Sequence, residues 1–137
     1  MGALIDGQAT ATPVGDAVEF ASLCRLWQDP PGSPGRCALG AVKANIGHLL
    51  TAAGAASLVK VLLALAHATL PATANFRQAA ATIPLAGSPF RILTESTPWP
   101  RRDATTPRRA AINGFGFGGI NAHLLLEEWI DPTPEEQ

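Results

Sequence analysis

The feature that most constrains the fold is a long run of small and apolar residues at positions 41–68. It opens as the end of a short strand, breaks at positions 45–48, and then predicts one long helix. The polar residues of that helix form one narrow stripe, which consists of Ser57, Lys60 and His67. The remaining circumference is apolar and must be covered. Because Lys60 interrupts the run and no apolar stretch reaches about 20 residues, a membrane span is disfavoured, and we expect a helix buried between layers of a globular protein.

The composition indicates one domain with a low share of charged residues. The 137 residues suffice for a single domain, which we place at 1–130, followed by a disordered acidic tail at 131–137. The net charge of −1 gives no general attraction to nucleic acid or to anionic lipid. Charged residues make up 15% of the chain, below the usual share of about 25%, so its apolar surface is hard to cover. We therefore expect a large partner interface and self-association through apolar surface.

The cysteine count and the N-terminal residues help to predict the cellular compartment and whether a metal site is present. Two cysteines are too few for a disulfide framework, and with three scattered histidines they show no metal-ligand spacing. The N-terminus has no basic region and no long apolar core, so it does not resemble a signal peptide. We expect a cytoplasmic protein without a metal site.

Hydrophobic periodicity predicts strands alternating with helices. A helix should begin with Asp16 as its N-cap, and Glu19 stands three residues on, as in a capping box. The apolar stripe of this helix consists of Phe20, Leu23, Cys24 and Trp27. Cys24 is therefore expected in the core rather than as a reactive thiol. Strands are expected at 3–5, 37–42, 90–93, 109–113 and 121–129.

A polar cluster of Lys43, Asn45 and His48 stands between the strand at 37–42 and the long helix. Ligands of open α/β sheets usually lie at such strand ends. His48 can serve there as a general acid, as a hydrogen-bond donor to an oxyanion, or as a structural histidine at a helix start, and these alternatives stay open. His67 and His123 are expected to be structural.

Glycines at 114, 116 and 119 match the G-x-G-x-x-G pattern of dinucleotide-binding loops. That fingerprint needs a following helix, a second strand and an acidic residue about 20 positions on. Only 18 residues follow Gly119, so we reject the nucleotide interpretation. The glycines instead favour a sharp hairpin turn whose backbone N–H groups can face a ligand, as in an oxyanion hole.

Three segments in order resemble the C-terminal half of a β-ketoacyl synthase, the condensing domain of polyketide and polyunsaturated fatty-acid synthases. They are ATATPVGD at 9–16, VKANIGH at 42–48 and GFGFGGINAH at 114–123. The resemblance implies an α/β fold, the C-terminal half of a thiolase-like structure layered αβαβα, with a mixed sheet and a central buried helix. In that family a cysteine nucleophile takes an acyl chain from acyl carrier protein, and two histidines assist decarboxylation of a malonyl thioester.

The resemblance also assigns roles. His48 matches the second histidine, Lys43 the lysine that orients the site, and Phe117 a gating phenylalanine whose N–H joins the oxyanion hole. The positions matched to binding of the phosphopantetheine arm are Gln8, Thr10, Thr12 and Asn121. The chain itself is expected to bind no cofactor; the phosphopantetheine arm carries the substrate, and the expected partners are acyl carrier protein or an N-terminal ketosynthase half.

Two departures from the family limit the chemistry. Gln8 stands where the family has its first histidine, and Ala11 replaces a glycine of the same loop. A glutamine side chain donates hydrogen bonds but does not act as an acid or base near neutral pH. In that family the nucleophilic cysteine lies in the N-terminal half of the ketosynthase. Neither Cys24 nor Cys37 lies in a sequence that matches the one around that cysteine.

Three functions follow from these observations. The preferred one is a truncated or split ketosynthase-like domain that cannot condense alone and acts as a structural or interaction part of a synthase. A second is one component of an active β-ketoacyl synthase, once an N-terminal half is supplied by another chain. The third is a free-standing module that binds acyl carrier protein or pantetheine.

Overall fold

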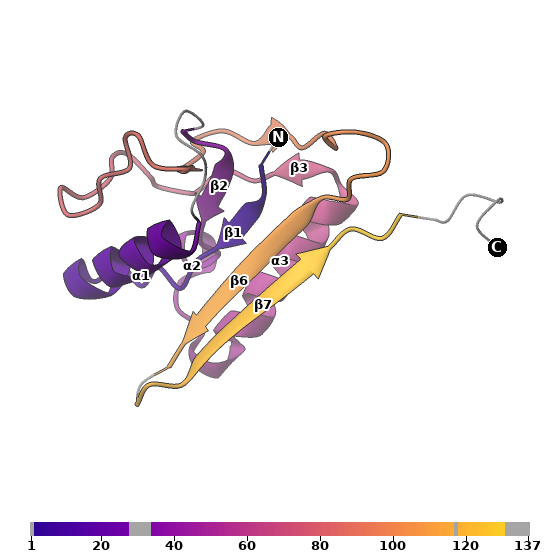
Figure 1. Ribbon diagram of the computed structural model, residues 1–137. Coiled ribbons are helices and arrows are strands. Elements are labelled where there is room, and N and C mark those ends of the chain that lie inside the picture. The colour runs from indigo at the N-terminus through magenta and orange to yellow at the C-terminus, as the bar shows by residue number, and fades with distance from the viewer. Residues whose placement is uncertain (1, 28–33, 117, 131–137) are drawn as a thin grey trace.

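The computed structural model describes residues 2–27, 34–116 and 118–130, so the tail expected at 131–137 lies outside the described residues. Five strands form one mixed sheet in the order β4-β2-β1-β6-β7 (Figure 1). These strands are β1 (Leu4–Asp6), β2 (Cys37–Gly40), β4 (Phe90–Arg91), β6 (Arg109–Phe115) and β7 (Asn121–Glu127). The first four are parallel and β7 is antiparallel to β6, which confirms the predicted mixed sheet.

Two helices cover opposite faces of this sheet. Helix α1 (Pro13–Leu26) packs on a cluster that includes Ala111, whereas α3 (Ala53–Ala66) packs on the neighbouring strand residues Ala110 and Ile112. Because successive strand residues point to opposite faces, the two helices lie on either side. Between them in sequence come the short helix α2 (Lys43–Ile46) and a 3₁₀ turn (Leu50–Ala52). A separate two-stranded sheet joins β3 (Thr69–Leu70) to β5 (Thr97–Pro98).

Helix α1 begins one turn earlier than predicted. Its N-cap is Thr12, whose hydroxyl accepts a hydrogen bond from the N–H of Gly15 at 3.2 Å. Pro13 occupies the first turn, where its fixed φ favours the helix and its missing N–H costs nothing. Asp16 therefore lies inside the helix, and the capping-box interpretation of Asp16 and Glu19 is wrong. The predicted apolar stripe is confirmed at Phe20 and Leu23, which are buried.

Helix α3 buries one face only. Ala53, Ser57, Val61 and Ala64 are buried against the sheet. On the other side Val59, Leu62 and Leu63 are 55%, 48% and 53% exposed. The sequence predicted cover around most of this helix, and the described residues supply it on the sheet side alone. No helix within the described residues is long and apolar enough to cross a membrane.

Other strand boundaries also differ from the expected ones: β1 lies at 4–6 instead of 3–5, β4 ends at Arg91 instead of 93, and β7 ends at Glu127 instead of 129. Strand β2 ends at Gly40 rather than at 42, so Lys43 begins a helical turn instead of following directly on a strand. Strand β6 continues through Phe115, because β7 pairs with it as far as Asn121. The predicted hairpin is confirmed, and Gly118 and Gly119 adopt φ values of 85° and 86°, which residues with side chains rarely adopt.

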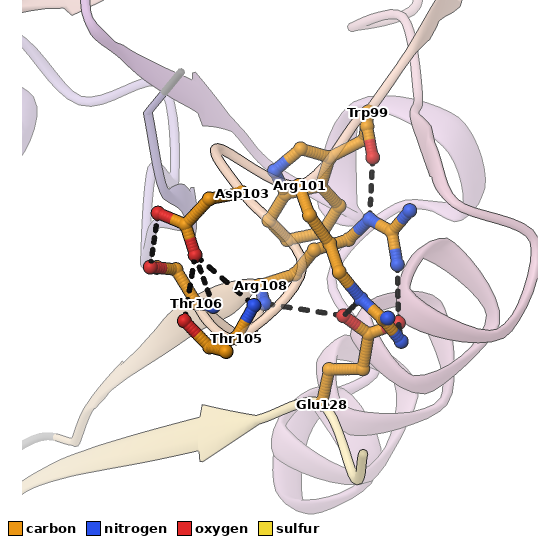
Figure 2. Close-up of polar contacts among 7 residues, drawn as sticks. All are labelled: Trp99, Arg101, Asp103, Thr105, Thr106, Arg108 and Glu128. Carbon is orange, nitrogen blue, oxygen red and sulfur yellow. Dashed lines mark hydrogen bonds and ion pairs between the residues drawn. The ribbon is translucent and has the colours of Figure 1, made fainter.

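A group of charged side chains ties the end of β7 to the segment before β6 (Figure 2). The Glu128 carboxylate accepts hydrogen bonds from the Arg101 guanidinium at 2.9 and 3.0 Å, and it also contacts the Arg108 guanidinium. Arg108 in turn donates to the carbonyl of Trp99. We call Arg101, Arg108 and Glu128 the arginine clasp. It lies at the edge of the sheet where β1 begins, since Trp99 Nε1 donates to the carbonyl of Gly2.

Candidate functional site

The candidate site lies at the opposite edge, where β1, β2 and β6 end. Parallel strands present their carboxyl ends at the same edge, so the segments that follow them meet there. The side-chain oxygen of Gln8, after β1, lies 3.4 Å from Nζ of Lys43, after β2. The same oxygen accepts a hydrogen bond from the N–H of Phe115, at the end of β6, at 3.2 Å. Three of the segments singled out from the sequence therefore meet at one side chain.

These contacts set the orientation of the Gln8 amide. Lys43 Nζ and Phe115 N–H are both donors, so the atom facing them must be the carboxamide oxygen. The NH₂ group of Gln8 then faces away from both and offers two N–H donors. This group can donate a hydrogen bond to a carbonyl oxygen.

Glu19 holds the backbone of the loop that carries Gln8. Its carboxylate accepts hydrogen bonds from the N–H groups of Gln8 and Ala9, at 2.8 and 2.9 Å. The loop needs this support, because Ala9 and Ala11 have positive φ values of 31° and 59°. Glu19 is buried at 8% exposure, and its role was missed because its spacing suggested a helix cap.

Glu19 also connects the loop to the β6–β7 hairpin. Asn113 Nδ2 donates to the Glu19 carboxylate at 2.8 Å, and Asn113 Oδ1 lies 2.5 Å from Nδ1 of His123. Asn113 is 3% exposed, whereas His123 is exposed. The sequence contained no signal for Asn113, because its partners lie 94 and 10 residues away.

His48 presents a hydrogen-bond donor. Its Nδ1 accepts a hydrogen bond from the N–H of Leu50 at 3.0 Å, so the neutral ring carries its proton on Nε2. Burial lowers the pKa of the neighbouring Lys43, while the carboxylates of Asp6 and Glu19 act in the opposite direction. The bond from Leu50, which begins the 3₁₀ turn, is a contact that a structural histidine at a helix start makes, and the Nε2–H is a donor that suits the other two roles, so all three interpretations of His48 stay open.

A cavity of about 740 Å³ opens beside these residues. It lies between the loop after β1, helix α1 and the segment at 73–83, and most of its walls are apolar. The polar side chains at its surface include Thr10, Thr12, Lys43 and His48. The cavity thus brings together four of the residues expected to bind or act on a substrate.

A buried ion pair supports the site from below. Lys60 Nζ lies 2.6 Å from Oδ1 of Asp6, whose side chain is fully buried, and Oδ2 of Asp6 accepts from the N–H of Val42 at 3.3 Å. The pair fixes the ends of β1 and of the segment leading to Lys43. A lone lysine in an apolar helix was the available sequence signal, since a buried charge needs a partner.

Among the described residues, the side chains of Asn45 and Asn121 take no part in this hydrogen-bond network. Asn45 is exposed at the α2 turn, and Asn121 is exposed opposite Phe115 at the turn end of β7. Phe117 lies outside the described residues. In the described part of the chain, no group of three or more His, Cys, Asp or Glu side chains is arranged to hold a metal ion.

Neither cysteine is placed as a nucleophile. Cys37 is fully buried in the core beneath α1. Cys24 packs against the same core, and burial raises the pKa of its thiol, which disfavours the reactive thiolate. The expectation that Cys24 lies on the buried side of its helix is confirmed.

Comparisons with known proteins give matches over nearly the whole chain. Residues 3–77 match the family described as Beta-ketoacyl synthase, C-terminal domain, and residues 80–137 match the Ketoacyl-synthetase C-terminal extension. The chain is 39% identical over 132 residues to a mycocerosic acid synthase-like polyketide synthase of Mycobacterium tuberculosis, covering 96% of this chain and 6% of that protein. It is 38% identical over 135 residues to the polyketide synthase GfsA of Streptomyces halstedii, covering 98% and 2%.

Solved ketosynthases share the fold. The ketosynthase from module 6 of the bacillaene synthase of Bacillus subtilis superposes with a TM-score of 0.88 at 38% identity, covering 94% of this chain and 23% of that one. An oxazolomycin ketosynthase domain of Streptomyces albus gives 0.86 at 40% identity, covering 96% and 23%. The chain thus spans about a quarter of these ketosynthases and less than a tenth of the synthases named above. It belongs to the β-ketoacyl synthase family, as a C-terminal domain of the kind found in the ketosynthases of polyketide synthases.

Proposed function

We propose that this domain holds a pantetheine-linked thioester in a ketosynthase site and does not by itself catalyse decarboxylative condensation. The observation that carries the proposal is Gln8, which stands where the resemblance places the first histidine and whose oxygen is occupied by Lys43 and by the N–H of Phe115. Its free N–H donors can bind a thioester carbonyl. They cannot exchange a proton near neutral pH, so the decarboxylation step lacks one of its two histidines.

The binding half of the site is supported by the cavity. Thr10 and Thr12 lie at its surface, and His48 Nε2–H and Lys43 add further donors. A pantetheine arm carries carbonyl groups and a long flexible chain, so a mostly apolar cavity with a few donors suits it. We expect acyl carrier protein to be the partner that delivers this arm, in the cytoplasm.

The nucleophile must come from another polypeptide segment. Cys37 is buried in the core under α1, and Cys24 packs against that core from α1 itself. A condensing site needs nucleophile, proton donor and oxyanion donors around one reacting atom. At the candidate site, the described residues supply hydrogen-bond donors but no nucleophile.

The test is an acyl-transfer assay on the purified chain with acyl-carrier-protein thioesters. We expect saturable binding of the holo carrier protein, seen by isothermal titration, and no covalent acyl-protein by mass spectrometry. Efficient self-acylation of this chain would overturn the proposal of inactivity. Absence of saturable carrier-protein binding would overturn the proposed binding function.

A second function is favoured by the retention of Lys43 and His48 at the site. With a cysteine-bearing N-terminal ketosynthase half supplied as a second chain, the domain would complete an active β-ketoacyl synthase. Under this hypothesis Gln8→His raises condensation turnover, and His48→Ala abolishes it. A complex that forms but shows no turnover with Gln8→His would exclude this function.

A further inference from the structure

The polar cluster between α1 and the β6–β7 hairpin has a fixed direction of hydrogen bonding. Glu19 Oε1 lies 2.8 Å from Nδ2 of Asn113. Turning this amide around would bring its oxygen against a buried carboxylate, so the orientation with Nδ2 toward Glu19 is the one that both groups can satisfy. The oxygen Oδ1 of Asn113 must then face Nδ1 of His123, at 2.5 Å.

This direction determines the tautomer of His123. Because Asn113 Oδ1 is an acceptor, His123 Nδ1 must carry the proton. The neutral ring then has a lone pair on Nε2, and His123 is an exposed residue. The two histidines of this edge therefore have opposite tautomers: His48 presents an N–H donor, and His123 presents an acceptor.

We infer that His123 is a further ligand-binding residue of the site and that Glu19, acting through Asn113, is its positioning residue. The inference rests on the proposed function, since the ligand is the same pantetheine arm. Gln8, Lys43 and His48 supply donors for carbonyl oxygens, and the amide N–H groups of the arm need acceptors. His123 Nε2 is such an acceptor, on the same hydrogen-bonded cluster as the backbone of Gln8.

The tautomer is tested by nitrogen-15 NMR of the full chain without ligand, recorded across pH so that the neutral rings are observed. We expect His123 to be protonated on Nδ1 and His48 on Nε2, which makes His48 an internal control in the same spectrum. Asn113→Ala should remove the preference of the neutral His123 ring for protonation on Nδ1. It should leave the tautomer of His48 unchanged. In Glu19→Gln, the side-chain oxygen can keep the place of Oε1, where it accepts from both the N–H of Gln8 and Nδ2 of Asn113, so the tautomer of His123 should stay unchanged.

The ligand role is tested by titrating pantetheine into paired variants. His123→Asn keeps a donor toward Asn113 but has no atom at the position of Nε2, whereas His123→Gln can place an oxygen there. We expect the Kd for pantetheine to rise about 3- to 10-fold in His123→Asn, as for loss of one hydrogen bond, and less in His123→Gln. His67→Gln, at the far end of α3, is the control and should bind as the unchanged chain does.

The outcomes separate the two proposals. A neutral His123 protonated on Nε2 in the unchanged chain would overturn the positioning role of Glu19, and this spectrum requires no variant to fold. Binding of pantetheine that is equal in His123→Asn and the unchanged chain would overturn the ligand role while leaving the proposed function intact. No binding of pantetheine or holo carrier protein by any form would overturn the proposed function and the ligand role together, and the spectrum would still decide the tautomer.

Discussion

At the scale of single residues, the buried pair of Asp6 and Lys60 holds two strand ends in register beneath the site. Lys60→Met would leave the fully buried Asp6 carboxylate without its cation, so we expect a loss of about 3–5 kcal/mol in the free energy of unfolding. Urea denaturation followed by circular dichroism measures this loss. The double variant Asp6→Asn with Lys60→Met should recover most of it, because no charge is then buried alone. An equal loss in the free energy of unfolding in the single and the double variant would contradict the ion-pair argument.

The Gln8 loop contains a strained alanine. Ala11 has a φ of 59°, in the left-handed region that costs an alanine roughly 1–2 kcal/mol and a glycine almost nothing. Glycine also makes the unfolded chain more flexible, which offsets about 0.4–1 kcal/mol. We therefore expect Ala11→Gly to stabilise the chain by about 0.5–1 kcal/mol in the same unfolding measurement.

The matched control is Ala21→Gly on the exposed face of α1. That position is in the middle of a helix, so the substitution should destabilise by about 1 kcal/mol. Two substitutions of the same chemistry should thus change stability in opposite directions. Destabilisation by both would show that the loop is not strained at Ala11.

At the scale of secondary-structure elements, the arginine clasp joins the hairpin to the segment before it (Figure 2). Within that segment, the Asp103 carboxylate accepts hydrogen bonds from Thr105 and Thr106. Hydrogen bonds from Arg101 lower the pKa of Glu128 from 4.5 to about 2. The hydroxyls of Thr106 and Thr105 lower the pKa of Asp103 from 3.8 to about 2. Both carboxylates bind protons more weakly in the folded chain than in the unfolded one. They therefore stabilise the fold at pH values above their ordinary pKa values of 4.5 and 3.8.

This stabilisation should disappear as the pH falls from about 4.5 toward 2. Thermal unfolding at a series of pH values should show the Tm falling across that window, and Glu128→Gln should flatten the fall while lowering the Tm at neutral pH. The control is Glu127→Gln, because the ion pair of Glu127 with Arg109 has both side chains more than half exposed and should contribute little. An unchanged acid profile in Glu128→Gln would exclude the clasp as its cause.

At the scale of the whole molecule, the most prominent feature is the uncovered side of α3. Val59, Leu62 and Leu63 are each about half exposed on a helix that is apolar almost throughout. Apolar surface of this kind is usually covered by another part of a protein or by a partner. The prediction that the helix is enclosed on most sides therefore requires polypeptide beyond the described residues.

We expect the isolated chain to self-associate through this surface. Sedimentation velocity should show a mass that increases with concentration, and the double variant Val59→Lys with Leu62→Lys should shift the chain to monomer. Val18→Lys, 59% exposed on α1 across the sheet, is the control for added charge and should leave the association unchanged. A mass that stays monomeric at all concentrations would contradict this prediction.

Much of the fold and part of the site could be predicted from local sequence. Periodicity placed α1, α3 and the principal strands, because the side-chain repeat of each element depends on neighbouring residues. Helix and strand ends shifted by a few residues where a proline or a strand partner decided them, as at Pro13 and Phe115. The order of three motifs predicted the family, and Gln8 at a histidine position led to the proposal that one proton transfer is missing.

What the sequence by itself determined was which elements form and which chemical groups the site contains. Only the tertiary structure decided how those groups are paired. Asp6 meets Lys60 across 54 residues, and Asn113 meets Glu19 across 94. These pairs exist because β1 lies between β2 and β6, with α1 and α3 on either face. A buried polar group takes whichever partner the packing of distant elements brings within hydrogen-bond reach, and neither spacing nor composition records that choice.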